Sequence, residues 1–198
     1  MNGHSSRPAE AVSAVHHATR WIAGLLGLEE ELVERAPAGS RFEPMHTTTN
    51  VGVINGGLAR CTVAGGCSFD WEMRPVQGSD ARFVKDRIAA LESGLLAEMR
   101  AVHPEAAIET EAVCEIDGLE WEESSPALDL MRSLLGGDPP VGVVAYGTEA
   151  GLYQAAGIPS VVWGPGDIAV AHRPDEFVEV SDLEVCLELL LGLGSRSE

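Results

Sequence analysis

Basic residues are scarce in this chain of 198 residues, which contains 13 lysines and arginines against 31 aspartates and glutamates. The formal net charge is therefore −18. Surfaces that bind nucleic acid are built from clustered lysine and arginine, so this composition argues against binding of DNA or RNA. Anionic membrane surfaces are disfavoured for the same reason. The acidic excess by itself indicates solubility rather than any particular partner.

Long apolar runs are missing as well, because no segment approaches the roughly 20 apolar residues that cross a bilayer. The stretch from His4 to Glu10 is polar, and no apolar core of a signal peptide follows it. Four cysteines are scattered without a Cys-x-x-Cys pair, which is typical of reduced thiols. A link between Cys61 and Cys67 stays open. We therefore expect a cytoplasmic protein with no membrane contact.

Helical and strand periodicities alternate over the first 116 residues. Apolar residues recur every three or four positions over 9–26, which predicts a helix with Ser6 as N-cap, Pro8 in the first turn and Gly27 as C-cap. Alternation of apolar and polar residues predicts strands further on. The expected order after the first helix is a loop over 36–44, strands over 47–54 and 67–76, a helix over 80–100 and a strand over 106–116.

The remaining residues show a different pattern, in which short apolar runs end in glycine-rich turns. Such runs are typical of interior strands in a sheet that helices cover on both faces. The expected elements are helices over 126–135, 149–156 and 182–193, the last capped by Ser181, and strands over 141–145 and 158–163. The change of pattern predicts two domains with a boundary near 116–123.

Five short motifs occur in one order along the chain. They are Gly3-His4-Ser5-Ser6-Arg7-Pro8, Asn50-Val51-Gly52-Val53-Ile54-Asn55-Gly56-Gly57, Glu72-Met73-Arg74-Pro75, Gly147-Thr148-Glu149-Ala150-Gly151 and Ala171-His172-Arg173-Pro174-Asp175-Glu176-Phe177. Together these five motifs resemble the zinc amidohydrolases of the acetylornithine deacetylase and succinyl-diaminopimelate desuccinylase family. The fourth and fifth motifs are most similar to those of acetylornithine deacetylases.

The resemblance implies an α/β protein in two parts. Residues 1–118 correspond to a lid or dimerisation domain of ferredoxin-like β-α-β-β-α-β order that lacks its first strand. Residues 119–198 correspond to the C-terminal portion of a metal-dependent catalytic domain. The family also implies a homodimer formed through the lid, a small N-acyl amino acid as substrate and a place in arginine biosynthesis.

The resemblance implies roles for two histidines. His172 matches the last metal ligand of the family, where the loop sequence alone indicates an ordinary surface histidine. Asp175 and Glu176 would orient its ring or lie in solvent. His4 matches a catalytic histidine that reaches into the active site of the partner subunit and stabilises the oxyanion. Its position alone indicates only a polar residue outside a helix.

The other candidate residues would contact the substrate. Arg74 would bind a substrate carboxylate through its two-pronged guanidinium, where the sequence alone also allows a salt bridge at the end of a strand. Gly147 and Thr148 would present backbone N–H and hydroxyl groups, and Gly166 would allow close approach of the backbone. These glycines are equally explained by their position in turns, where glycine is common.

Two departures from the family bear on activity. Cys61 stands where the family usually has an asparagine that positions substrate. The regions that supply the remaining ligands of two zinc ions, for which cobalt is a possible substitute, and the catalytic glutamate have no counterpart here, and Glu149 does not match that base. We therefore expect a C-terminal fragment of a deacylase that is inactive alone. Desuccinylase or carboxypeptidase-like activity, a non-catalytic dimerisation module and an inactive truncated product stay open.

Overall fold

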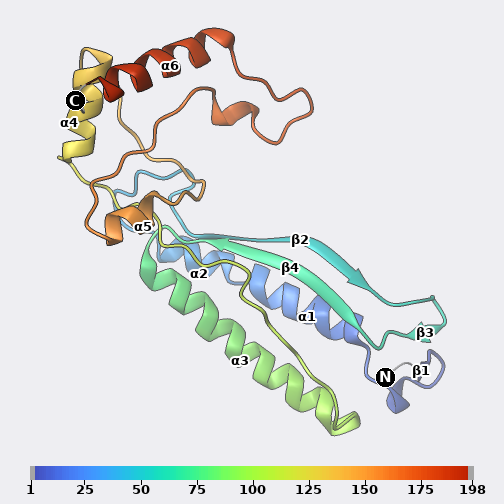
Figure 1. Ribbon diagram of the computed structural model, residues 1–198. Coiled ribbons are helices and arrows are strands. Elements are labelled where there is room, and N and C mark those ends of the chain that lie inside the picture. The colour runs from blue at the N-terminus through green and yellow to red at the C-terminus, as the bar shows by residue number, and fades with distance from the viewer. Residues whose placement is uncertain (1–2, 196–198) are drawn as a thin grey trace. The chain divides into compact units, whose positions relative to one another are not determined.

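A computed structural model describes residues 3–195 and divides the chain into two compact units (Figure 1). The first unit runs up to Val113 and also includes Val144–Tyr146. The second comprises Cys114–Val143 and the residues from Gly147 onward. No helix within 3–195 is long and apolar enough to cross a membrane.

The first unit mixes helices with two small antiparallel sheets. Its sheets pair β1 with β3 and β2 with β4. The elements in chain order are β1 (Gly3–His4), the 3₁₀ turn η1 (Pro8–Glu10), α1 (Ala14–Leu26), α2 (Glu29–Glu34), β2 (Thr48–Gly56), β3 (Thr62–Val63), β4 (Cys67–Arg74) and α3 (Gly78–Val102).

The first helix begins later than its periodicity predicted. Ser13 is the N-cap of α1, because its side chain accepts a hydrogen bond from the backbone N–H of His16 at 3.3 Å. The prediction of Ser6 as N-cap was wrong, since Pro8 starts a separate 3₁₀ turn that ends at Glu10. Gly27 follows the last helical residue as predicted, and its N–H bonds to the carbonyl of Ala23 at 2.9 Å.

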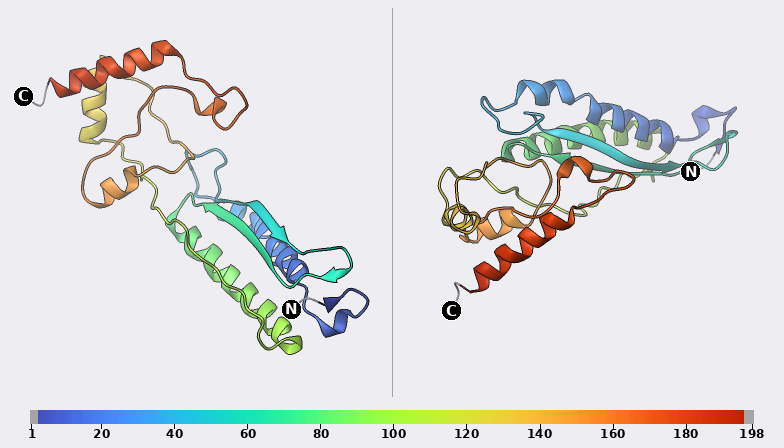
Figure 2. Two further views of the ribbon diagram at one scale, coloured as in Figure 1. Left: turned by 45° about the vertical axis from the view of Figure 1, so that its right-hand side comes forward. Right: turned by 90° about the horizontal axis from the view of Figure 1, so that it is seen from above.

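The hairpin of β2 and β4 forms the larger sheet. Its register pairs Thr48 with Arg74 and Gly56 with Cys67, with an irregularity between Val51 and Val53. Gly56 has no room for a side chain, because a Cβ there would lie 2.8 Å from the Sγ of Cys67. Along β4 half-buried and exposed residues alternate strictly, as the sequence predicted for residues 67–76. The hairpin runs alongside α1 (Figures 1 and 2).

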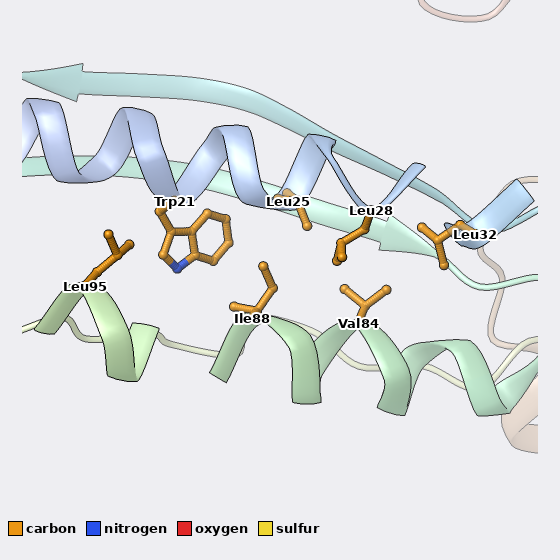
Figure 3. Close-up of a cluster of buried hydrophobic side chains, with 7 residues drawn as sticks. All are labelled: Trp21, Leu25, Leu28, Leu32, Val84, Ile88 and Leu95. Carbon is orange, nitrogen blue, oxygen red and sulfur yellow. The ribbon is translucent and has the colours of Figure 1, made fainter. Parts of the chain in front are cut away.

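The core lies between α1, α3 and the inner face of the hairpin. Figure 3 shows the α1 and α2 side chains directed towards those of α3. The indole of Trp21 contacts the rings of Phe69 and Trp71, with centroids 4.8 and 5.4 Å away. Burying such rings removes a large apolar area from water, which stabilises the unit by about 25 cal/mol per Å². The buried cluster is Trp21, Leu25, Leu28, Leu32, Val84, Ile88 and Leu95.

A buried polar network joins the start of β2 to the start of α3. The carboxylate of Asp80 is fully buried and accepts hydrogen bonds from Arg35 Nε at 2.9 Å and from Thr47 Oγ1 at 2.6 Å. The hydroxyl of Thr47 in turn accepts from the N–H of Val76 at 3.0 Å. A buried carboxylate is tolerated only when it is paired in this way. The network therefore fixes where the chain leaves β4, directly after Arg74.

Residues 106–116 are extended but do not form the predicted strand. Ala106 and Ile108 pack against the core, and Thr110 donates to Glu92 of α3 at 2.9 Å. Within the described chain, however, no backbone N–H of residues 107–113 donates to another backbone group. The prediction was wrong because a strand requires a neighbouring strand, and the alternation of side chains alone does not supply one.

The second unit contains helices and extended segments. Its elements are α4 (Pro126–Leu135), α5 (Ala150–Ala155), the 3₁₀ turn η2 (Ile168–Val170) and α6 (Val180–Gly194). The predicted strands over 141–145 and 158–163 are not formed, because no neighbouring strand in the described chain offers them hydrogen bonds. Ser181 is not the cap of α6, since the helix begins at Val180 and its N-cap position is Glu179.

Candidate functional site

His4 lies at one end of the first unit, in the short strand β1. It pairs with Thr62 of β3, and the next amide, Ser5 N–H, donates to the carbonyl of Cys61 at 3.1 Å. The residue before His4 must be small, because a Cβ at Gly3 would lie 2.6 Å from the Cβ of Ala11. Backbone contacts thus fix the main chain on both sides of the histidine.

The imidazole of His4 is exposed, and its contacts select one tautomer. The N–H of Ser6 donates to Nδ1 at 3.2 Å, and the Ser6 hydroxyl lies 2.7 Å from the same nitrogen. A nitrogen that accepts a backbone hydrogen bond carries no proton in the neutral ring, so the proton is on Nε2. Nε2 makes no hydrogen bond within residues 3–195. His4 therefore presents a free N–H donor to solvent.

Arg74 is the last residue of β4, and its guanidinium is already engaged. Nε and Nη2 both donate to the carboxylate of Glu72, each at 3.1 Å, and Nη1 donates to the carbonyl of Ala145 at 3.4 Å. Residues two apart on a strand share a face, which is why this pair forms. The strand-end salt bridge that the sequence allowed is present. The side chains of Arg74 and Glu72 are both about half exposed, so a carboxylate of a ligand in solution can reach the guanidinium.

His4 and Arg74 lie at opposite ends of the hairpin. The β1–β3 pair precedes the start of β4 at Cys67, whereas Arg74 ends the strand (Figure 1). At about 3.3 Å per step from one residue to the next, the distance from Cys67 to Arg74 along the eight residues of β4 is roughly 23 Å. This separation is much longer than a small N-acyl amino acid. The two residues of one subunit therefore cannot contact the same substrate molecule.

In the second unit, Thr148 serves the start of α5. Its hydroxyl accepts the N–H of Ala150 at 3.2 Å, so the hydroxyl is used locally. A Cβ at Gly147 would meet no heavy atom within 4 Å, whereas a Cβ at Gly151 in α5 would lie 2.1 Å from the carbonyl oxygen of Asp117. Gln154 also bonds to both backbone groups of Glu120. The required glycine of this motif is therefore Gly151.

The loop after residue 163 turns sharply at three positions. Gly166, His172 and Asp175 have positive φ angles of 93°, 60° and 65°. Glu176 accepts the backbone N–H of His172 at 2.9 Å and so stabilises the turn rather than the ring. The expectation that Glu176 orients the imidazole is therefore not met. The ring of His172 is exposed at the tip of this turn.

The residues present do not fit a metal ion. Zinc in proteins takes about four ligands, three of them from the protein in catalytic sites. Across residues 3–195, no group of three or more histidine, cysteine, aspartate or glutamate side chains could hold a metal. His172 therefore has no second or third ligand in this part of the chain. The free cysteines do not supply one either, and burial raises the pKa of the Cys67 thiol.

Two features of the site were missed from the sequence. Glu72 is the partner of Arg74, and the period of two along a strand was the signal for it. Gly151 is the close-packed position of the fourth motif, and no sequence signal distinguishes it from Gly147, because the atoms it meets come from residues 117 and 118.

Comparison with protein families and sequences gives consistent matches. A family model described as a peptidase dimerisation domain matches residues 1–99. The chain is 33% identical over 95% of its length to an acetylornithine deacetylase from Myxococcus xanthus. It is also 33% identical over 96% of its length to an acetylornithine deacetylase from Proteus mirabilis strain HI4320. These alignments cover 48% and 47% of the two proteins, so the chain spans about half the length of the curated relatives it matches.

Solved structures match nearly the whole of this chain and about half of the matched protein, as the sequence relatives do. A tripeptidase from Staphylococcus aureus matches 96% of this chain with a TM-score of 0.65 at 19% identity, and the match covers 47% of that protein. A similarity at this level of identity shows the fold alone. It confirms the predicted α/β class of mixed helices and strands.

Proposed function

This chain belongs to the peptidase dimerisation domain family, and we propose that its residues supply the lid and the closing part of the catalytic domain of a metal-dependent N-acyl-amino-acid deacylase, most like acetylornithine deacetylase. The family resemblance inferred from the five motifs is thereby confirmed. In this proposal residues 1–118 form the lid and residues 119–198 the end of the catalytic domain. The relatives named acetylornithine deacetylase support it, because they match nearly the whole chain.

The observation that carries the proposal is the separation of His4 from Arg74 along the hairpin. A lid histidine that acts on the active site of a second subunit must point away from its own substrate-binding residues, and roughly 23 Å of strand achieves this. The tautomer of His4 also suits the role, since its Nε2–H is a free donor. Such a donor stabilises negative charge that develops on an amide oxygen during hydrolysis.

Arg74 would hold the free carboxylate of the amino-acid part of the substrate. In this structure its two-pronged contact is made with Glu72. The substrate carboxylate would replace the Glu72 carboxylate in the same geometry, so the site exchanges one ion pair for another. We expect Glu72 to weaken the binding of ligands that contact the site only through a carboxylate. A ligand carboxylate must displace the Glu72 carboxylate from Arg74, and it does so only if the ligand also makes other contacts in the site.

The family resemblance is the reason that this proposal includes a metal ion. A complete enzyme of the resembling family holds two zinc ions, for which cobalt is a possible substitute, and they supply an activated water. His172 is the residue of this chain that matches a ligand, and the described residues offer no others near it. The chain by itself therefore does not fit the metal.

A chimera tests the function directly. The half of the Myxococcus xanthus acetylornithine deacetylase that this chain does not cover would be fused to residues 1–198. We expect the chimera to bind zinc and to hydrolyse N-acetylornithine faster than N-succinyl-diaminopimelate or a dipeptide. His4→Ala should lower kcat by about 10²–10³-fold without loss of zinc. Glu105→Ala, at an exposed position after α3 and outside the proposed dimer interface, is the control.

Mixing two inactive variants of the chimera tests action between subunits. A dimer of one His4→Ala and one Arg74→Ala subunit has one site with both defects and one intact site. Random mixing should therefore restore about a quarter of the unmodified activity. No recovery on mixing would contradict the role of His4 in a partner subunit. A folded, zinc-loaded chimera that prefers the dipeptide would contradict the deacylase assignment.

A further inference from the structure

The side chain of His4 is held by a tight turn that begins at His4 itself. The N–H of Arg7 donates to the carbonyl of His4 at 2.9 Å, which closes a four-residue turn with Ser5 and Ser6 at its centre. The N–H of Ser6 donates to Nδ1 of His4 at 3.2 Å. Asparagine and aspartate side chains close turns by accepting the N–H two residues further on, and His4 does so through its ring. The turn is therefore closed by both the backbone and the imidazole.

Ser6 contacts the same ring nitrogen a second time, through its hydroxyl. The hydroxyl oxygen lies 2.7 Å from Nδ1 of His4. A backbone N–H can only donate, so Nδ1 of the neutral ring is the acceptor and carries no proton. The hydroxyl must then donate as well, because its lone pairs would repel the lone pair of Nδ1. Ser6 thus supplies two donors to one side of the imidazole.

These contacts fix the orientation of the whole ring. β1 pairs His4 with Thr62, and the N–H of Ser5 donates to the carbonyl of Cys61 at 3.1 Å, so the main chain is held on both sides. A histidine side chain then has only χ1 and χ2 left to vary, and a contact at one ring nitrogen restricts both. The direction of Nε2, on the far side of the ring from Nδ1, is therefore set by Ser6.

The chemistry of these contacts separates two uses of a histidine. Where a hydrolase uses histidine as a base, a carboxylate accepts the Nδ1 proton and Nε2 is left free to take another. At His4 the groups facing Nδ1 are donors instead, so Nε2 of the neutral ring carries the proton and donates it. Donation into Nδ1 also polarises the ring, which makes Nε2–H a stronger donor.

We propose that Ser6 is a positioning residue for His4. Its N–H and its hydroxyl hold Nδ1, and they make the imidazole a fixed hydrogen-bond donor rather than a base. The catalytic consequence rests on the proposed function, whereas the held ring does not. Both residues are exposed, and an exposed hydrogen bond contributes modestly. Loss of the Ser6 hydroxyl should therefore lower kcat by about threefold to tenfold, less than loss of the imidazole.

Nuclear magnetic resonance on the purified chain tests the held ring without any catalysis. An N–H···N hydrogen bond gives a scalar coupling between its two nitrogens, which can be detected from the carbon-bound ring protons. At about pH 8, where imidazoles are mostly neutral, we expect this coupling between the backbone nitrogen of Ser6 and Nδ1 of His4. Ser6→Ala should weaken it, because the backbone donor remains but the shorter contact from the hydroxyl is lost. Ser6→Thr, which keeps a hydroxyl, should retain it.

Kinetics of the chimera test the catalytic consequence. Ser6→Ala should lower kcat about threefold to tenfold with KM unchanged, and Ser6→Thr should restore most of the loss. In a His4→Ala background, Ser6→Ala should have no further effect, because Ser6 acts through His4. A residue that only stabilised the turn would give the same loss in either background.

Ser5→Ala is the matched control from the same turn. The N–H of Ser5 donates to Cys61 and survives the substitution, and its hydroxyl makes no hydrogen bond within residues 3–195. We expect Ser5→Ala to change neither the coupling nor kcat. If Ser6→Ala unfolds by circular dichroism, Ser6→Gly is the second variant, since it also keeps the N–H and lacks the hydroxyl.

Three results would overturn this inference. They are absence of the coupling in the unmodified chain, equal kcat for Ser6→Ala and Ser5→Ala, and a further loss from Ser6→Ala in the His4→Ala background. An inactive unmodified chimera would contradict the proposed function instead. The coupling in the 198-residue chain would then decide alone whether Ser6 holds the ring.

Discussion

Two glycines of one motif differ in what surrounds them, and this difference predicts opposite responses to alanine. A Cβ at Gly151 would lie 2.1 Å from the carbonyl oxygen of Asp117, whereas Gly147 meets nothing within 4 Å. Gly151→Ala should therefore destabilise the chain by about 1–3 kcal/mol, since α5 or residues 117–118 must shift. Gly147→Ala should change stability by less than about 0.5 kcal/mol. Urea unfolding of both variants checks this pair, and equal effects would contradict the packing described.

Candidate site residues could be proposed from the sequence more readily than their contacts. The motifs single out His4, Arg74 and His172, and the structure places each at an exposed position at the end of an element or in a turn. Their roles stay predictions. Their partners did not follow, because a hydrogen bond depends on local geometry. Glu176 binds the backbone of His172 since positive φ there turns the N–H towards it. Spacing alone does not encode that angle.

The contact between α1 and α3 contains a titrating pair that predicts the pH dependence of stability. Arg20 donates to Glu98, with Nη2 and Oε1 2.9 Å apart, and this hydrogen bond lowers the pKa of Glu98. A lowered folded-state pKa stabilises the fold above the ordinary value of about 4.3, and this contribution is lost as the pH falls through the folded-state pKa. Glu98→Gln should therefore reduce the acid sensitivity of the melting temperature.

The matched control for this pair is Glu105→Gln, at an exposed position after α3. Melting curves at neutral pH and below pH 4 should show a smaller difference for Glu98→Gln than for the control. The pair is exposed, so the change is small and should decrease further with added salt. Identical acid sensitivity in both variants would rule out the contribution assigned to Arg20 and Glu98.

Helices were predicted from the sequence better than strands. Each predicted helix is present, α4 with the predicted ends and the others with shifted ends, because amphipathic spacing is a property of the segment itself. The strands of the hairpin were also predicted correctly, since their partner lies nearby in the chain. The segments 106–116, 141–145 and 158–163 have strand-like composition but no strand beside them in the described chain. A strand depends on its neighbour, and that information lies outside the segment.

Local stability should follow this difference between paired and unpaired segments. Hydrogen exchange should be faster at 141–145 and 158–163 than at 67–76, because only the last segment has a ladder of strand hydrogen bonds in the described chain. Val144, Ile158 and Trp163 are also exposed, with 40%, 52% and 38% of their surfaces accessible. Stronger protection at 141–145 than at 67–76 would show that the second unit forms a sheet by itself.

At the scale of the whole molecule, the proposed lid predicts a homodimer formed through α1 and β2. Val53 and Ile54 of β2 are about half exposed, which is unusual for adjacent apolar residues on a strand. Val53→Lys should weaken the dimer by at least about tenfold, whereas Val102→Lys at the end of α3 should not. Light scattering at micromolar concentration measures the mass. A strictly monomeric unmodified chain would contradict this interface.

The division of the site between this chain and regions it does not contain is the central claim, and zinc content with turnover tests it most directly. The purified 198-residue chain would be incubated with zinc or cobalt, freed of excess metal, analysed for bound metal and assayed on N-acetylornithine. We predict no stoichiometric metal and no hydrolysis above the buffer rate, because His172 has no further ligands in the described residues. One or two ions per chain together with turnover of about 1 per second or more would contradict the account.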